Sequence, residues 1–153
     1  MVQRYVWTGV KQTTLYSRLV GLARESWGAR YVVVDATGIG AGLASFLEKA
    51  LPHRVIPFVF SQVSKSELGW NFLGIVDSGR YKEYAPDGAS DTALWWRQLE
   101  AVEYEVQTGP GKLMRWSVPD PTLHDDLVIS AALCAVLDKL DWRPRRAIGG
   151  QRD

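Results

Sequence analysis

Two acidic positions in this chain have residue types that can bind a divalent metal ion, and the first is Asp35. It ends the β-branched run 31–34 and opens the glycine-rich turn 36–40. Open α/β sheets carry their ligand sites at the carboxyl ends of such strands, so the Asp35 carboxylate is a candidate metal ligand. Capping of the helix after the turn is the alternative role. The turn has no lysine and matches neither common phosphate-binding glycine motif, so nucleotide binding is weakly indicated.

The second acidic position is the pair Asp125 and Asp126, near the start of an apolar helix. Thr122 and Asp125 have the spacing of a capping box, and acids stabilise the positive end of a helix dipole. Capping needs only one acid, and adjacent carboxylates repel each other unless a cation or water offsets their charge. The pair is therefore a second candidate for metal ligation. His124 and His53 are too few for a zinc site or a catalytic triad.

The elements that must position these acids follow from the apolar pattern. Continuous apolar runs at 31–34 and 55–60 predict two strands covered on both faces, and 2–8 reads as a shorter strand. Alternation at 104–108 and 112–118 predicts a hairpin. Helical spacing predicts helices that start at Thr13 or Thr14 and that cover about 40–51, 64–77, 92–102 and 123–140. The alternating order implies an α/β fold with a mainly parallel central sheet and helices on both faces.

Composition limits the class of protein. The chain has 153 residues, 46% of them hydrophobic and 23% charged, which suits one soluble globular domain, expected over 1–141 with a flexible basic tail at 142–153. The net charge of +1 gives no global attraction for nucleic acid. Cys134, the only cysteine, is expected to be a buried, inert thiol and excludes an intrachain disulfide, which fits a reducing cytosol. No stretch is long and apolar enough to cross a membrane.

Local clustering of basic residues is a separate signal for nucleic acid. Each of them alone is typical of a solvated surface, but around an acidic site together they would hold phosphates. The candidates are Lys65, Arg80, Lys82, Lys112 and Arg115, with further arginines in the tail.

Four segments occur in the order seen in a known family. The run 32–40 resembles the second acidic strand of the C-terminal nuclease domain of the terminase large subunit of tailed bacteriophages. The segments 55–58 and 64–68 resemble the strand and helix that come next there, and 124–127 resembles its last acidic motif. The likeness extends in order from about residue 5 to 140. It implies an RNase H-like three-layer sandwich with an added β-hairpin.

The resemblance also implies an activity, namely Mg²⁺- or Mn²⁺-dependent endonuclease cleavage of concatemeric double-stranded DNA during genome packaging. It implies that Asp35 and Asp126 are metal ligands, that Asp125 shares the catalytic site, and that two ions act. One ion would lower the pKa of the attacking water while the other stabilises the leaving oxygen. The implied partners are DNA, an ATPase domain, a small terminase subunit and the portal. The implied location is the cytoplasm of a phage-infected or prophage-carrying bacterium.

The chain departs from the family at one position. The family carries a further acid on the first strand of its sheet, whereas 1–8 contains none, and no P-loop is present. We therefore expect a domain that lacks the first acidic strand and the ATPase domain, and that cuts DNA weakly or not at all. An open sheet edge would favour self-association. The alternatives are a Holliday-junction-resolvase-like nuclease, a non-catalytic DNA- or partner-binding module, and a small nucleotide-binding domain.

Overall fold

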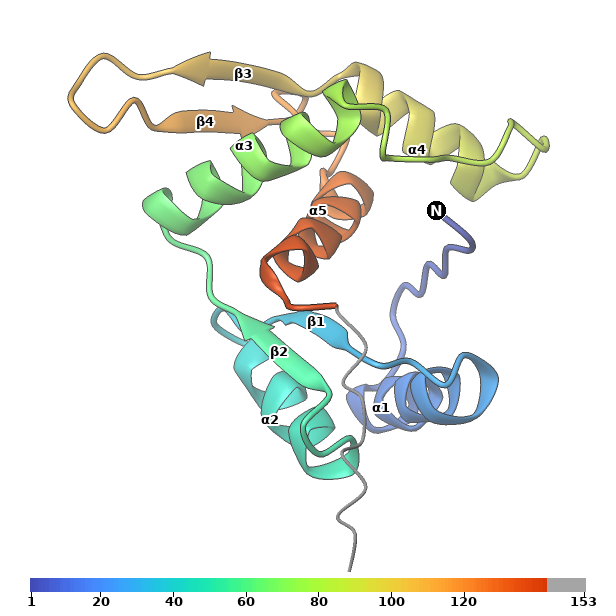
Figure 1. The fold of residues 1–153 in the computed structure, drawn as a ribbon. Coiled ribbons are helices and arrows are strands. Elements are labelled where there is room, and N and C mark those ends of the chain that lie inside the picture. The colour runs from blue at the N-terminus through green and yellow to red at the C-terminus, as the bar shows by residue number, and fades with distance from the viewer. Residues whose placement is uncertain (143–153) are drawn as a thin grey trace, which may run out of the picture.

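The computed structural model describes residues 1–142 as a mixed α/β arrangement with five α-helices and two sheets of two strands each (Figure 1). The predicted basic tail lies almost wholly outside the described residues. No helix in the described part is long and apolar enough to cross a membrane. The α/β class is confirmed, whereas the parallel sheet has only two strands in residues 1–142 and the three-layer sandwich remains a proposal.

The parallel sheet pairs β1 (Val32–Asp35) with β2 (Val55–Phe58), in a register that sets Asp35 opposite Phe58. Helix α2 (Gly40–Ala50) connects the two strands, as parallel pairing requires. It buries Ala44 and Leu47, which lie three residues apart on one helix face. The two predicted strands and the helix between them are confirmed, but no strand residue is fully buried, so the prediction that both faces are covered is wrong for this pair.

The N-terminal segment is not a strand, so the prediction at 2–8 is wrong. A strand needs a neighbour for its backbone groups, and the segment instead runs to α1 (Gln12–Gly21) and a π-helical turn (Leu22–Ser26). The helix begins after Lys11 without a side-chain cap, so neither threonine caps it. The ammonium group of Met1 donates to the Lys82 carbonyl, which ties the segment to a distant part of the chain.

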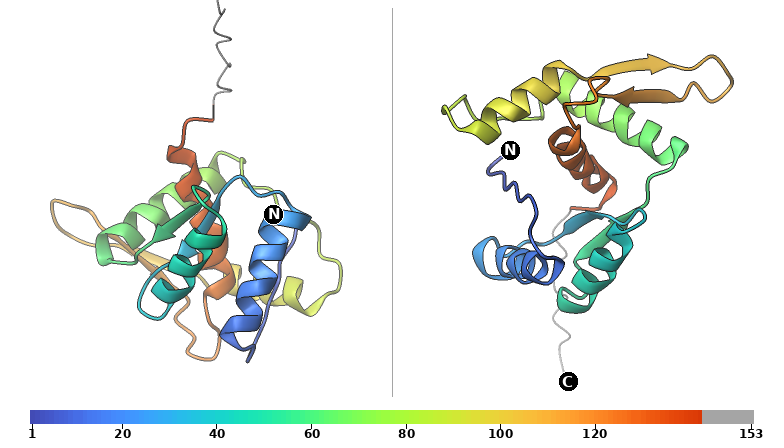
Figure 2. Two further views of the ribbon diagram at one scale, coloured as in Figure 1. Left: turned by 90° about the horizontal axis from the view of Figure 1, so that it is seen from below. Right: turned by 180° about the vertical axis from the view of Figure 1, so that it is seen from behind.

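A second group of elements lies on the other side of α5 from the parallel strands (Figures 1 and 2). Ser61 caps α3 (Gln62–Asp77) in a capping box with Ser64, and α4 (Ser90–Glu100) follows. The predicted hairpin is confirmed as β3 (Glu103–Val106) and β4 (Met114–Ser117), paired antiparallel with Tyr104 opposite Trp116.

The core forms where α3, α4, the hairpin and the last helix meet. Helix α5 (Asp126–Leu133) continues into a 3₁₀ helix (Cys134–Lys139), so the predicted last helix exists but starts later than expected. Cys134 is exposed, which corrects the predicted buried thiol, although nearby protein still raises the pKa of the thiol by desolvation. The buried core residues shared by these elements are Leu68, Phe72, Trp95, Met114, Trp116, Val128, Ala131, Ala132, Leu133 and Ala135.

Gly69 sets the distance between α3 and β4. A Cβ atom at this position would lie 2.5 Å from Trp116 Nε1 and 2.7 Å from Met114 Sδ. Both side chains are buried, and Trp116 Nε1 is held by a 2.8 Å hydrogen bond to the Lys65 carbonyl. Neither can therefore move freely, and only glycine permits this contact.

We expect Gly69→Ala to lower the free energy of unfolding by about 1–3 kcal/mol, because the added methyl group overpacks the contact with Trp116. Gly74 is the matched control, since a Cβ atom there meets nothing within 4 Å in the same helix. Gly74→Ala should instead raise stability by about 0.5–1 kcal/mol through helix propensity. Urea denaturation of both variants tests this. An increase in the free energy of unfolding in both variants would show that the space at Gly69 accommodates a methyl group.

Candidate functional site

Asp35 lies at the carboxyl end of β1 with its side chain exposed to solvent. Its Oδ1 accepts a hydrogen bond of 2.8 Å from the Thr37 amide, and the Thr37 hydroxyl accepts one of 2.9 Å from the Phe60 amide. The turn after β1 is thereby joined to the chain after β2. Asp35 does not cap α2, whose N-cap is Ile39 without a side-chain bond. The capping role is therefore wrong, and one Asp35 carboxylate oxygen faces no described protein donor.

The glycine turn holds the backbone of Asp35 at close range. A Cβ atom on Gly40 would lie 2.3 Å from the Asp35 carbonyl oxygen, far inside contact distance. Gly38 has φ +54°, a conformation that glycine adopts without strain. The glycines therefore serve the geometry of the turn at Asp35.

We expect Gly40→Ala to destabilise the protein by about 1–3 kcal/mol, because the clash is with backbone rather than with a movable side chain. Gly42→Ala is the control in the same helix, where a Cβ atom meets nothing within 4 Å. It should raise stability by up to about 1 kcal/mol. Thermal unfolding of the pair measures the difference, and equal melting temperatures would contradict the close approach at Asp35.

The pair Asp125 and Asp126 begins α5 without capping it. Asp126 is the first helical residue, and Asp125 occupies the N-cap position with no side-chain cap bond. Thr122 instead donates from its amide and its hydroxyl to Asp120 Oδ1, at 2.8 and 2.7 Å. The predicted capping box is wrong because this local turn uses the threonine. Asp125 Oδ2 lies 3.8 Å from Lys65 Nζ, so a protein cation already offsets part of its charge.

The two acidic positions lie on different elements, Asp35 at the end of β1 and the pair Asp125 and Asp126 at the start of α5. Helix α5 begins beside α4, where the Leu127 amide donates to Gln98 Oε1 at 2.9 Å, and the chain then runs towards β1 (Figure 1). Within residues 1–142, no group of three His, Cys, Asp or Glu residues could hold a metal ion. Carboxylate oxygens suit Mg²⁺ and Mn²⁺, so the expected metal ligation by Asp35 and Asp126 stays a prediction.

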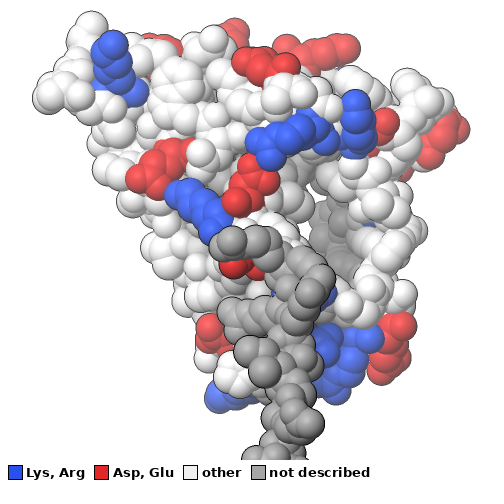
Figure 3. Space-filling model, in the orientation of Figure 1, with Lys and Arg blue, Asp and Glu red and all other residues white. Residues whose placement is uncertain are grey.

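Three of the five predicted DNA-binding residues form ion pairs with acids. Besides Lys65, Arg80 Nη1 lies 2.7 Å from Asp138 Oδ2, and Arg115 Nη1 lies 3.5 Å from Glu105 Oε1. Lys82 and Lys112 are exposed. Acidic and basic side chains alternate over the face in Figure 3, without a broad patch of one sign. Any phosphate contact on this face would be local, and Arg115 would compete with its own glutamate for it.

A buried polar cluster escaped prediction from the sequence. Arg4 and Glu83 form an ion pair of 3.5 Å with side chains only 4% and 8% exposed. The Arg4 guanidinium also lies over the rings of Tyr84 and Trp95, 4.6 and 5.2 Å from their centroids. No local signal marks this pair, because its members are 79 residues apart.

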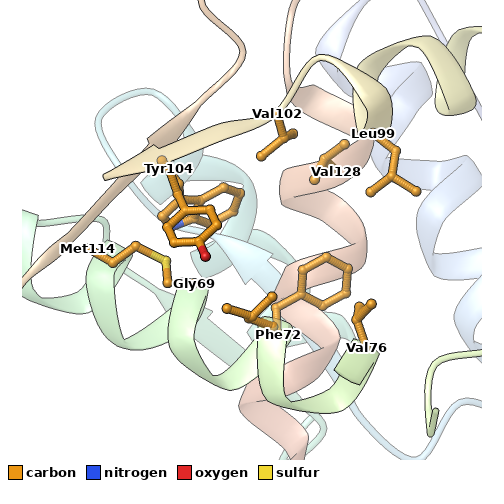
Figure 4. A pocket seen from close by; sticks show the side chains of 10 residues that line it. Gly69, Phe72, Val76, Leu99, Val102, Tyr104, Met114 and Val128 are labelled. Carbon is orange, nitrogen blue, oxygen red and sulfur yellow. The ribbon is translucent and has the colours of Figure 1, made fainter. Parts of the chain in front are cut away.

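An apolar cavity of about 210 Å³ opens between α3, the end of α4, β3 and α5 (Figure 4). The side chains in Figure 4 include Phe72, Val76, Leu99 and Val128, with the Tyr104 ring among them. Asp35, Asp125 and Asp126 do not line it. This cavity is therefore separate from the acidic positions.

Comparison with known proteins adds no assignment: no family model, curated protein or solved structure matches this chain.

Proposed function

We propose that this chain belongs to a metal-dependent endonuclease domain of a DNA-packaging terminase, in which Asp35 supplies one carboxylate of the site. The proposal rests on the position and the exposure of Asp35. It is an exposed carboxylate at the carboxyl end of a parallel strand, and it is not used as a helix cap. The resemblance of 32–40, 55–58, 64–68 and 124–127 to the terminase nuclease domain supports the same assignment.

The site as proposed needs more than the described acids provide. Asp126 is the first residue of α5 and its carboxylate is exposed, so it is the acid that the proposal adds to Asp35. We therefore assign to Asp35 the binding of a divalent cation next to a DNA phosphate and to Asp126 a supporting role in the same site. Weak cleavage by the chain alone follows.

The test is plasmid cleavage in Mn²⁺, Mg²⁺ or EDTA by the wild-type chain beside Asp35→Ala and Asp126→Ala. Asp77→Ala is the control, since Asp77 is an exposed acid at the end of α3. We expect slow nicking in Mn²⁺ that EDTA and Asp35→Ala abolish and that Asp77→Ala leaves unchanged. Nicking that persists in Asp35→Ala would refute the proposed site. A preference for branched over linear DNA would favour a resolvase-like nuclease.

A non-catalytic binding module is the second candidate, and the ion pair between Asp125 and Lys65 favours it. In that arrangement Asp125 serves to position and partly neutralise Lys65 rather than to bind metal. DNA binding that survives EDTA, without cleavage and without change in Asp35→Asn, would support the module over the nuclease.

A further inference from the structure

The outer edge of the hairpin is open. In residues 1–142, β3 has β4 as its one strand neighbour, and all four residues of β3 are exposed. An edge strand offers unpaired backbone N–H and C=O groups to another extended chain. Main-chain hydrogen bonds then give affinity, and alternate side chains give specificity.

The two faces of β3 differ in chemistry. Tyr104 and Val106 share the face on which their partners Trp116 and Met114 are buried under α3. They are nevertheless 58% and 44% exposed, so α3 covers only the β4 half of this apolar face. Tyr104 also borders the cavity shown in Figure 4. A chain added at this edge would therefore meet an apolar surface on one side.

The opposite face is acidic at the same edge. Glu103 lies opposite Ser117, and Glu105 lies opposite Arg115 at 3.5 Å, so two carboxylates face a single cation. Opposite charges on neighbouring strands stabilise a sheet, and like charges destabilise it. The edge therefore favours a strand with basic side chains opposite the glutamates and apolar side chains between them.

From these features we propose that the free edge of β3 binds an extended segment of a partner protein in which basic and apolar residues alternate. Nucleic acid fits poorly, because the glutamates repel phosphate. A second copy of the chain also fits poorly. If two copies paired β3 with β3 in antiparallel fashion about a two-fold axis normal to the sheet, the glutamates of both copies would lie on the same face. Every register within the strand would then place glutamates opposite each other. The proposal does not depend on the nuclease assignment.

The probe is the acetylated and amidated hexapeptide Lys-Val-Lys-Val-Lys-Val, compared with Glu-Val-Glu-Val-Glu-Val and with a Lys-Val peptide N-methylated at alternate residues. Binding is followed by ¹⁵N shift changes of the protein as each peptide is titrated into it. We expect shifts centred on 103–106 with the first peptide and about tenfold weaker binding of the second. N-methylation should cost a similar factor or more, because it removes backbone donors.

A charge-reversed protein completes the design. In Glu103→Lys/Glu105→Lys the preference should invert, so that the glutamate peptide binds about tenfold more tightly than the lysine peptide. If this variant fails to fold, the peptide comparison on the wild type still decides. The proposal would be overturned if the N-methylated peptide bound as tightly as the unmodified one, or if the shift changes lay outside 103–106. It would also be overturned by a homodimer formed through β3, or by the absence of binding at millimolar peptide.

Discussion

Arg4→Met is expected to lower the free energy of unfolding by about 3–5 kcal/mol, because it leaves the Glu83 carboxylate buried without its cation. Glu83 also accepts hydrogen bonds from the Tyr81 hydroxyl at 2.8 Å and from the Tyr84 amide at 3.0 Å. Burial and the bond to Glu83 raise the pKa of Tyr81, so its hydroxyl remains a donor at neutral pH. Urea denaturation measures the loss.

The double variant distinguishes a buried unpaired charge from a strong ion pair. Arg4 Nε and Nη1 are buried without a hydrogen-bond partner, so the guanidinium is itself incompletely satisfied. Replacing both charges, as in Arg4→Met/Glu83→Gln, should therefore restore stability to within about 1 kcal/mol of the wild type. Glu83→Gln alone should be destabilising. Additive losses in the double variant would show that Arg4 and Glu83 stabilise the protein independently, with no energetic coupling between the two charges.

This cluster also explains why the N-terminal segment is not a strand. Residues 2–8 read as a short strand, but the local sequence does not supply a neighbouring strand with which they could pair. In the structure Arg4 enters the core over Tyr84 and Trp95 instead. The segment is therefore held by the Met1 ammonium group and the Arg4 side chain, which contact residues about 80 positions away, and a pattern in the local sequence carries no such information.

The sequence pattern was sufficient for those helices and strands that depend on the periodicity of neighbouring residues. The apolar runs at 31–34 and 55–60, with a helical pattern between them, predict the parallel pair that the structure shows, because helices and strands have distinct periodicities. The same reasoning placed Asp35 at a strand end. It placed the start of α5 wrongly, because Asp120 engages Thr122 in a turn that delays the helix to Asp126.

The relation between the acidic positions was beyond local reasoning. The distance between Asp35 and Asp126 depends on the direction in which α5 crosses the core, and α4 anchors its first turn through Gln98. Two acids at element ends are therefore predictable one at a time, whereas their assembly into a site depends on packing. The resemblance implied a shared site, and that remains a prediction for the cleavage assay.

Trp95→Ala is expected to destabilise the protein by about 3–5 kcal/mol, because Trp95 is fully buried at the centre of the core. Its ring stacks on Tyr81 with centroids 6.1 Å apart. Trp70→Ala is the control, since Trp70 is 42% exposed on α3, and it should cost at most about 1 kcal/mol. Similar losses in the two variants, measured by urea denaturation, would mean that the core is not centred on Trp95.

The effect of Trp95 should also depend on Arg4. The guanidinium lies 5.2 Å from the Trp95 ring, and both residues contact the segment 81–84. Removing the ring leaves the cation buried beside a cavity, so water can reach a charge that the native core keeps dry. The loss in Trp95→Ala/Arg4→Met should therefore be smaller than the sum of the single losses by at least about 0.5 kcal/mol. Strict additivity would separate the aromatic core from the ion pair and would limit the role of Arg4 to Glu83.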